Sequence, residues 1–122
     1  MKTILFIEDE AALQKTFGKI LEEERFKVIP ALDGDIGLKL VKLKKPDLVL
    51  LDLILPRRNG FEVLKEIKED EETKNIPIIV LTNLETIDNV DKALALGATT
   101  YLVKANYSLK EVITKVKQTL TK

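Results

Sequence analysis

The sequence predicts a doubly wound α/β domain, in which helices cover both faces of a parallel sheet. The chain of 122 residues contains five short apolar runs, and each run stops at a turn residue or a polar side chain. Between the runs, apolar residues recur with the 3.6-residue period of an amphipathic helix. Strands that alternate with helices in this way favour parallel pairing through right-handed crossovers.

The apolar runs have the length and composition of strands buried on both faces. The third run is the strongest, because four consecutive aliphatic residues lead directly to Asp52. The second run is the weakest, and Pro30 is expected to stop it. The expected strands are residues 4–7, 28–29, 48–51, 78–81 and 100–103.

The segments between the strands carry helix signals. Ser108 is a candidate N-cap with Glu111 three residues further on, and Gly97 is a candidate helix stop. Gly37 weakens the second helix, because glycine is a poor helix former. The expected helices lie within residues 13–21, 35–44, 61–67, 87–94 and 109–120.

Five strand–helix units favour the flavodoxin-like strand order 2-1-3-4-5 in a single domain that covers residues 1–122. In this arrangement a ligand binds outside the carboxyl ends of the strands, where the first and third strands lie side by side.

Composition excludes several kinds of chemistry. The chain has no Cys and no His, so Cys/His metal sites, thiol catalysis and histidine proton relays are excluded. The 20 basic residues balance the 20 acidic ones, which argues against a general nucleic-acid binder. No apolar run approaches the ~20 residues of a membrane span. The start of the chain is too short and polar for a signal peptide, so we expect a cytoplasmic protein.

Polar side chains follow four of the expected strands. Glu8 and Asp9 follow the first strand, Asp52 the third, Thr82 the fourth and Lys104 the fifth. Three neighbouring carboxylates repel one another, so the site needs a cation beyond the lysine. Ligands that are all oxygen favour Mg²⁺, Ca²⁺ or Mn²⁺, and a site with open positions suits Mg²⁺. A carboxylate beside Mg²⁺, a lysine and a hydroxyl is equipped to accept a phosphoryl group.

These residues give the sequence a resemblance to the receiver domain of the two-component response-regulator family, in particular to its stand-alone, chemotaxis-regulator-like members. The resemblance covers nearly the whole chain. Each motif alone is weak, but all of them occur in the right order at the right strand ends. The matching positions are Glu8-Asp9, Asp52 with Pro56 and Gly60, Thr82, Tyr101 and Lys104.

The resemblance implies a metal-dependent phosphoacceptor. Asp52 would take a phosphoryl group from a phosphohistidine on a histidine kinase or a histidine phosphotransfer protein. Asp9 would bind Mg²⁺ directly and Glu8 through water, and the backbone carbonyl of Ile54 would complete the metal site. Lys104 would pair with a phosphoryl oxygen.

The resemblance also implies a switch. Thr82 would hydrogen-bond a phosphoryl oxygen and move inward, and Tyr101 would turn inward behind it. This movement would remodel the face formed by the fourth helix, fifth strand and fifth helix, which binds a downstream protein target. Such a domain is a signalling module and not an enzyme.

Some positions differ from the usual family pattern. Glu8 stands where Asp is more usual, and Ala105 follows Lys104 where Pro is usual. In the family the bond between this lysine and the proline is typically cis. A cis bond without proline costs ~3 kcal/mol, so we expect a trans Lys104–Ala105 bond. Ile54 and Leu84 are apolar at positions that flank the path of hydrolytic water in the family. We therefore expect slow self-dephosphorylation.

Two further features bear on access and docking. Asn83 is larger than the residue usual after the switch threonine, so entry to the acceptor is expected to be narrow. Gly18 lies in the middle of the first expected helix. Close packing against a neighbour would explain a glycine there, and so would a shallow groove in which a partner kinase's helices dock.

Other functions remain open at this point. A receiver fold can serve as an unphosphorylated protein-interaction scaffold. A Mg²⁺-dependent phosphohydrolase would use Asp52 as nucleophile. That class usually has a second acid two residues further on as its general acid, and this chain has Ile54 at that position. A nucleotide-binding domain is disfavoured, because the chain has neither G-x-G-x-x-G nor a P-loop. Only residues 121–122 follow the last expected helix, so no output domain is expected in this chain.

Overall fold

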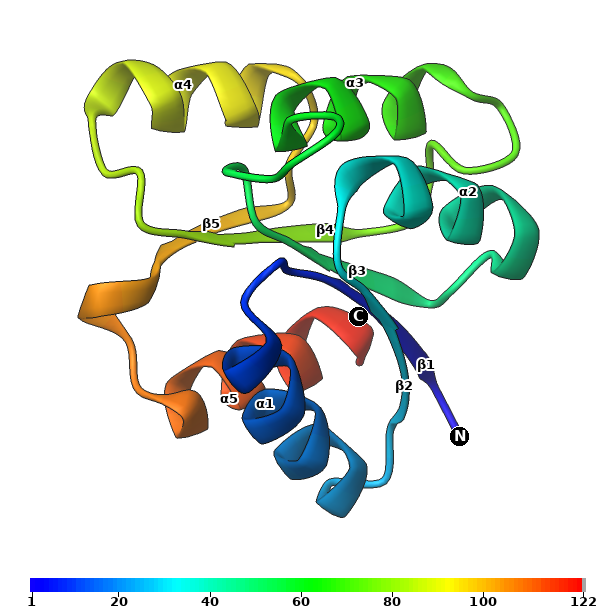
Figure 1. Ribbon diagram of the computed structural model, residues 1–122, viewed down its shortest axis with the longest axis vertical. Helices are drawn as coiled ribbons and strands as arrows, with labels where there is room; N and C mark the ends of the chain where they lie inside the picture. The colour runs from blue at the N-terminus through cyan, green and yellow to red at the C-terminus, as the bar shows by residue number, and fades with distance from the viewer. Residues whose placement is uncertain (122) are drawn as a thin grey trace.

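A computed structural model describes residues 1–121 as a five-stranded parallel sheet in the order β2-β1-β3-β4-β5. Helices α1 and α5 lie on one face of the sheet, and α2, α3 and α4 lie on the other (Figure 1). Strand order and element type are therefore as predicted. The elements are β1 (Thr3–Ile7), α1 (Ala11–Glu23), β2 (Lys27–Ala31), α2 (Gly34–Lys44), β3 (Leu48–Leu51), α3 (Gly60–Glu69), β4 (Ile78–Thr82), α4 (Ile87–Ala95), β5 (Thr100–Val103), the 3₁₀ turn η1 (Lys104–Asn106) and α5 (Leu109–Leu120).

The sequence reading of β2 was too short. The strand runs through Pro30 to Ala31, because β2 is an edge strand that, within residues 1–121, pairs only with β1. Lys27 donates its amide to Lys2 at 2.9 Å, and Ala31 accepts from Glu8 at 2.9 Å. In an edge strand every second residue points its backbone amide away from the partner strand, and Pro30 occupies one of these positions in β2. A proline is tolerated there because it removes no hydrogen bond of the sheet.

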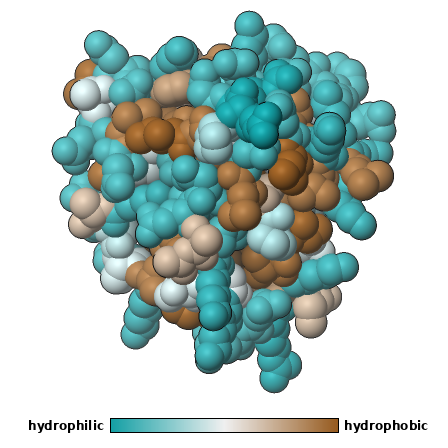
Figure 2. Space-filling view, viewed as in Figure 1, coloured by the Kyte–Doolittle hydropathy of each residue, from teal (hydrophilic) through white to brown (hydrophobic). Residues whose placement is uncertain are grey.

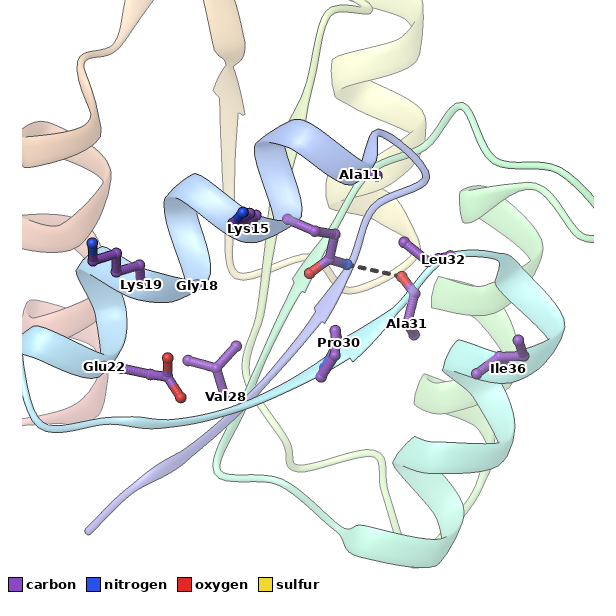
Figure 3. Close-up of a pocket in the computed structure, with 11 residues that line it drawn as sticks. Ala11, Lys15, Gly18, Lys19, Glu22, Val28, Pro30, Ala31, Leu32 and Ile36 are labelled. Carbon is purple, nitrogen blue, oxygen red and sulfur yellow. Dashed lines mark hydrogen bonds between the residues drawn. The ribbon is translucent and has the colours of Figure 1, made fainter.

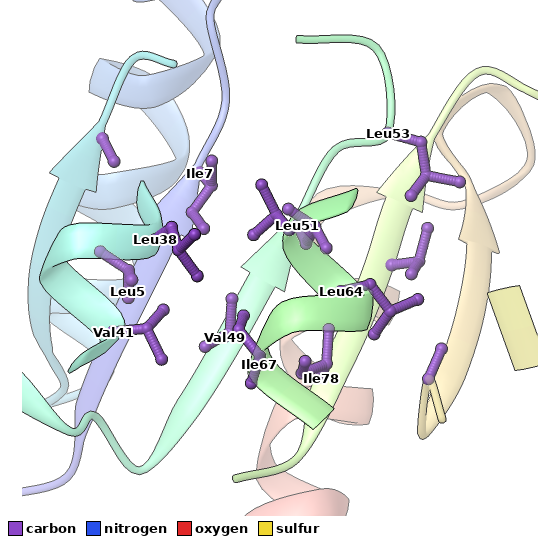
Figure 4. Close-up of a cluster of buried hydrophobic side chains, with 14 of the residues drawn as sticks. Leu5, Ile7, Leu38, Val41, Val49, Leu51, Leu53, Leu64, Ile67 and Ile78 are labelled. Carbon is purple, nitrogen blue, oxygen red and sulfur yellow. The ribbon is translucent and has the colours of Figure 1, made fainter. Parts of the chain in front are cut away.

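The two faces of the sheet bury two apolar clusters. Side chains alternate along β1, so Ile4 and Phe6 point to one face while Leu5 and Ile7 point to the other. The ring of Phe6 packs 5.4 Å from that of Phe17 in α1. Figure 4 shows the opposite cluster, where α2 and α3 cover the sheet. Its central members are Leu5, Ile7, Leu38, Val41, Val49, Leu51, Leu64 and Ile67.

The predicted helix signals are present in the structure. Ser108 and Glu111 form a capping box at the start of α5. Gly97 follows α4 with a φ of 109°, a backbone conformation that favours glycine. Asp33 and Asn59 also cap α2 and α3, each accepting a backbone amide with its side chain.

Helix α4 packs differently from what its apolar spacing suggests. Ile87 is 75% exposed and Leu94 is 46% exposed, while Ala93 is the buried residue of the helix. The apolar stripe of α4 therefore lies mainly on the surface. On the side of the molecule seen in Figure 2, hydrophobic surface forms separate patches between hydrophilic side chains. Across residues 1–121, no helix has both the length and the apolar character needed to cross a bilayer.

Candidate functional site

The carboxyl ends of β1 and β3 bring three acidic residues together. Ile7 and Leu51 are paired at the ends of these neighbouring strands, so the next residues along each strand meet at the same edge. Glu8, Asp9 and Asp52 each offer a carboxylate oxygen, and these oxygens lie within 4.8 Å of one another. Glu8 and Asp52 are buried, whereas Asp9 is exposed. The predicted acidic cluster is thus present, with one side open to solvent.

Lys104 is the cation that faces this cluster. It begins η1, directly after β5, and its side chain is 17% exposed. Its Nζ lies 2.9 Å from Asp52 Oδ2 and 2.5 Å from Glu8 Oε1. The Lys104–Ala105 bond is trans, as expected. The lysine therefore reaches the acids without the cis bond that a proline would favour.

Burial and neighbouring charges have opposite effects on the pKa values of Glu8 and Lys104. Burial raises the pKa of the Glu8 carboxyl above its usual value, and the Lys104 ammonium offsets only part of that effect. Burial by itself lowers the pKa of Lys104, but Glu8 and Asp52 outweigh it, so the pKa of the lysine is raised. Lys104 is consequently protonated at neutral pH. One ammonium faces three carboxylates, and the cluster keeps an excess of negative charge.

The donor set fits a hard divalent cation. Glu8 Oε1 is buried with the Lys104 ammonium as its cationic neighbour, and the same ammonium also contacts Asp52. A single ammonium shared by clustered carboxylates leaves repulsion between them that a divalent cation would relieve. The exposed carboxylate of Asp9 leaves a path for the ion from solvent. Oxygen ligands with open positions are typical of Mg²⁺ sites.

The loop after β3 lies against Asp52. The Ile54 amide donates to Asp52 Oδ1 at 3.2 Å, and the Ile54 side chain is exposed. This amide contact was not anticipated, because a backbone donor leaves no mark in the sequence. Gly60 closes the loop, since a Cβ at this position would lie 2.4 Å from the Asp52 carbonyl oxygen. Packing thus explains why the sequence has glycine there.

Thr82 and Tyr101 are both connected to Leu84. Thr82 ends β4 and is fully buried, and its Oγ1 accepts from the Leu84 amide at 3.4 Å. The Tyr101 hydroxyl donates to the Leu84 carbonyl at 2.7 Å. Burial, and then the charge of Asp52, raise the pKa of this phenol. The sequence indicated Leu84 only as an apolar residue near the expected acceptor, and this backbone link between the two switch candidates was not predicted.

A groove of about 780 Å³ lies on another side of the molecule, between α1, β2 and the start of α2 (Figure 3). Gly18 lines it, and among the described residues a Cβ at this position would approach only Val28, at 3.9 Å. Close packing therefore does not explain Gly18. The groove anticipated from the sequence is present, while its use by a kinase stays a prediction.

Comparisons with known proteins agree with this geometry. Residues 4–117 match the response regulator receiver domain family. The phosphate regulon transcriptional regulatory protein PhoB of Pseudomonas aeruginosa is 35% identical over 119 residues, which are 98% of this chain and 52% of that protein. A CheY-like receiver domain protein from Methanospirillum hungatei JF-1 superimposes with a TM-score of 0.92 at 26% identity, covering 99% of this chain and 94% of that one. The Mn²⁺-bound form of response regulator Rcp1 gives a TM-score of 0.83 at 31% identity, covering 97% and 91%.

The chain therefore belongs to the response regulator receiver domain family, whose members are signalling domains of two-component systems. It spans about half the length of the curated relatives it matches.

Proposed function

We propose that Asp52 is the phosphoacceptor of this receiver domain. A carboxylate oxygen of Asp52 attacks the phosphorus of a phosphohistidine on a histidine kinase or a phosphotransfer protein. The phosphorus–nitrogen bond breaks, the imidazole leaves with the bonding electron pair, and an aspartyl phosphate forms. The observation that carries the proposal is the position of Asp52: a buried carboxylate at a strand end, paired with Lys104 and next to two further acids.

The donor set supports a Mg²⁺-dependent reaction. Asp9, Asp52 and the backbone carbonyl of Ile54 would hold the ion, with Glu8 acting directly or through water. The bound ion would neutralise negative charge as the phosphoryl group approaches the acidic cluster. Rcp1, which resembles this chain over most of its length, has been solved with Mn²⁺ bound, and this supports a divalent cation here.

Lys104 and Thr82 would each contact an oxygen of the phosphoryl group once Asp52 is phosphorylated. The Lys104 ammonium already contacts Asp52 and has only a short distance to move to a phosphoryl oxygen. The Thr82 hydroxyl would bond a second oxygen and release the Leu84 amide. Tyr101, held on the Leu84 carbonyl, would then turn inward. The exposed apolar residues of α4 belong to the face that these movements would reshape for a downstream protein.

The remaining parts of the proposal concern the whole chain. Residues 1–122 would form one domain that meets its kinase and its target through protein contacts, without binding nucleic acid or membrane itself. It would be a signalling domain with slow self-dephosphorylation at most. The cytoplasmic location and the slow dephosphorylation expected from the sequence stay predictions.

Intact mass spectrometry tests the acceptor assignment. Protein incubated with Mg²⁺ and a small acyl phosphate is expected to gain one phosphoryl group, and Asp52→Asn is expected to gain none. Asp91→Asn changes an exposed acid of the same type on α4 and should be phosphorylated like the unaltered protein. An adduct that persists in Asp52→Asn would contradict the assignment. An unaltered protein that neither gains mass nor binds Mg²⁺ would favour the scaffold alternative.

A further inference from the structure

Arg58 lies in the β3–α3 loop (residues 52–59) and ties together the two helices that flank it. Its Nε lies 3.0 Å from Asp35 Oδ1 in the first turn of α2. Its Nη1 lies 2.5 Å from Glu66 Oε2 in α3. The Arg58 side chain is partly covered, with an exposure of 35%. One side chain of the loop thus bridges two helices on the same face of the sheet.

The loop backbone is also seated on the start of α2. The Gly34 amide donates to the Pro56 carbonyl at 3.3 Å. A Cβ at Gly34 would lie only 1.9 Å from the Arg58 carbonyl oxygen, so helix and loop touch backbone to backbone. Arg57, between the two contacts, has a φ of 71°, in the left-handed region that non-glycine residues rarely adopt. The surrounding contacts must over-determine this conformation for it to persist.

The Ile54 backbone lies between two anchored points of the loop. One is Arg58, which contacts α2 and α3, and the other is Leu53, just after the end of β3. The Leu53 side chain is buried, and its carbonyl accepts from the Gly60 amide at 2.9 Å. The Ile54 amide contacts the Asp52 carboxylate. The backbone at Ile54 is therefore held from the sheet side at Leu53 and from the helix side at Arg58.

We propose that Arg58 is a positioning residue that fixes the Ile54 backbone against the acidic cluster, and so sets the affinity of the cluster for a divalent cation. Arg58 itself touches no member of the cluster. It acts because two acids from α2 and α3 hold its planar guanidinium, and these acids would repel each other without it. The inference rests on the proposed function, because the cation is the one that the acidic cluster would bind.

Calorimetric titration of the metal-free protein with MgCl₂ tests this role. Arg58→Gln is expected to raise the Kd for Mg²⁺ about tenfold, as is typical when a residue that orients metal ligands is lost. Arg57→Gln is the matched control: Arg57 is exposed and, among the described residues, makes no ion pair, so its variant should keep the Kd. The double variant Asp35→Asn/Glu66→Gln removes the same bridge from the other side and should reproduce the loss.

Two further measurements separate positioning from general stability. Hydrogen exchange at the Ile54 amide should accelerate in Arg58→Gln, and Arg58→Lys should recover only part of the affinity, because an ammonium lacks the planar fork. An Arg58→Gln protein with reduced unfolding free energy but an unchanged Kd would overturn the inference, leaving a structural role alone. If the unaltered protein itself failed to bind Mg²⁺, the proposed metal site would fail instead, so the two failures are distinguishable.

Discussion

At the scale of single residues, Lys104 is an internal counter-ion for the acidic cluster. Its side chain reaches Glu8 and Asp52 from the end of β5, and all three groups are largely removed from solvent. A buried acid that loses its only cationic partner is strongly destabilising, whatever the net worth of the pair. Lys104 therefore matters for stability independently of the proposed phosphorylation.

Replacing this lysine should have a metal-dependent effect. Lys104→Met keeps the apolar stem and removes the charge, so without Mg²⁺ the free energy of unfolding should fall by on the order of 3 kcal/mol. Saturating Mg²⁺ should restore part of that loss, since the ion supplies the missing positive charge. Urea unfolding with and without Mg²⁺ measures both values. Lys110→Met, at an exposed position of α5, should change neither; an equal loss in both variants would contradict the counter-ion role.

Sequence reasoning located these residues because each follows an apolar strand, and parallel strands end at one edge. It could not foresee contacts made by backbone atoms. The Ile54 amide on Asp52 and the Leu84 link between Thr82 and Tyr101 depend on loop conformation, and the sequence pattern carries no signal for it.

At the scale of elements, the glycines inside α1 and α2 look alike in sequence but have different surroundings. A Cβ at Gly18 meets open space apart from Val28 at 3.9 Å, within the described part of the chain. A Cβ at Gly37 would lie 2.6 Å from Cδ1 of Ile7, a residue of the buried core. The first position faces the groove of Figure 3, whereas the second is pressed against β1.

Replacement of glycine by alanine should therefore have opposite effects on the stability of the protein at Gly18 and at Gly37. Gly18→Ala should stabilise the protein by about 1 kcal/mol, the difference in helix propensity between alanine and glycine. Gly37→Ala gains the same propensity but forces Ile7 to move, and overpacking of this kind typically costs about 1–3 kcal/mol. Thermal unfolding of both variants gives the comparison. Stabilisation by Gly37→Ala would show that Ile7 has room to move.

Helix α4 shows where periodicity stops being informative. Its apolar spacing correctly predicted a helix, but Ile87 and Leu94 lie largely in solvent and Ala93 takes the buried position. Spacing reports that a helix has an apolar stripe. It does not report whether the stripe meets the protein's own core or another surface.

At the scale of the whole molecule, metal binding should be visible as stability. A ligand that binds the folded state alone adds about 2.7 kcal/mol at a hundred times its Kd. The melting temperature of the metal-free protein should therefore rise steadily as Mg²⁺ is added. Asp9→Asn should abolish the rise, and its starting temperature should not be lower, because removing one of three clustered carboxylates relieves repulsion. A melting curve of Asp9→Asn that still responds to Mg²⁺ would show that Asp9 is not a ligand.

Most of the global arrangement could be predicted from the sequence, since alternating strand and helix patterns leave few topologies for a parallel sheet. The strand order and the site edge both followed from this argument. The main element boundary that differed was the end of β2, where an edge strand accepts a proline that a central strand would exclude.

The position of Pro30 also bears on how copies of the protein behave in concentrated solution. An edge strand normally offers free amides to which another chain can add a strand, the first step of many aggregates. At Pro30 the outward-facing amide is missing, so an incoming strand would find a gap in the row of donors along β2. The residue that made β2 hard to recognise thus protects this edge of the sheet against growth into fibres.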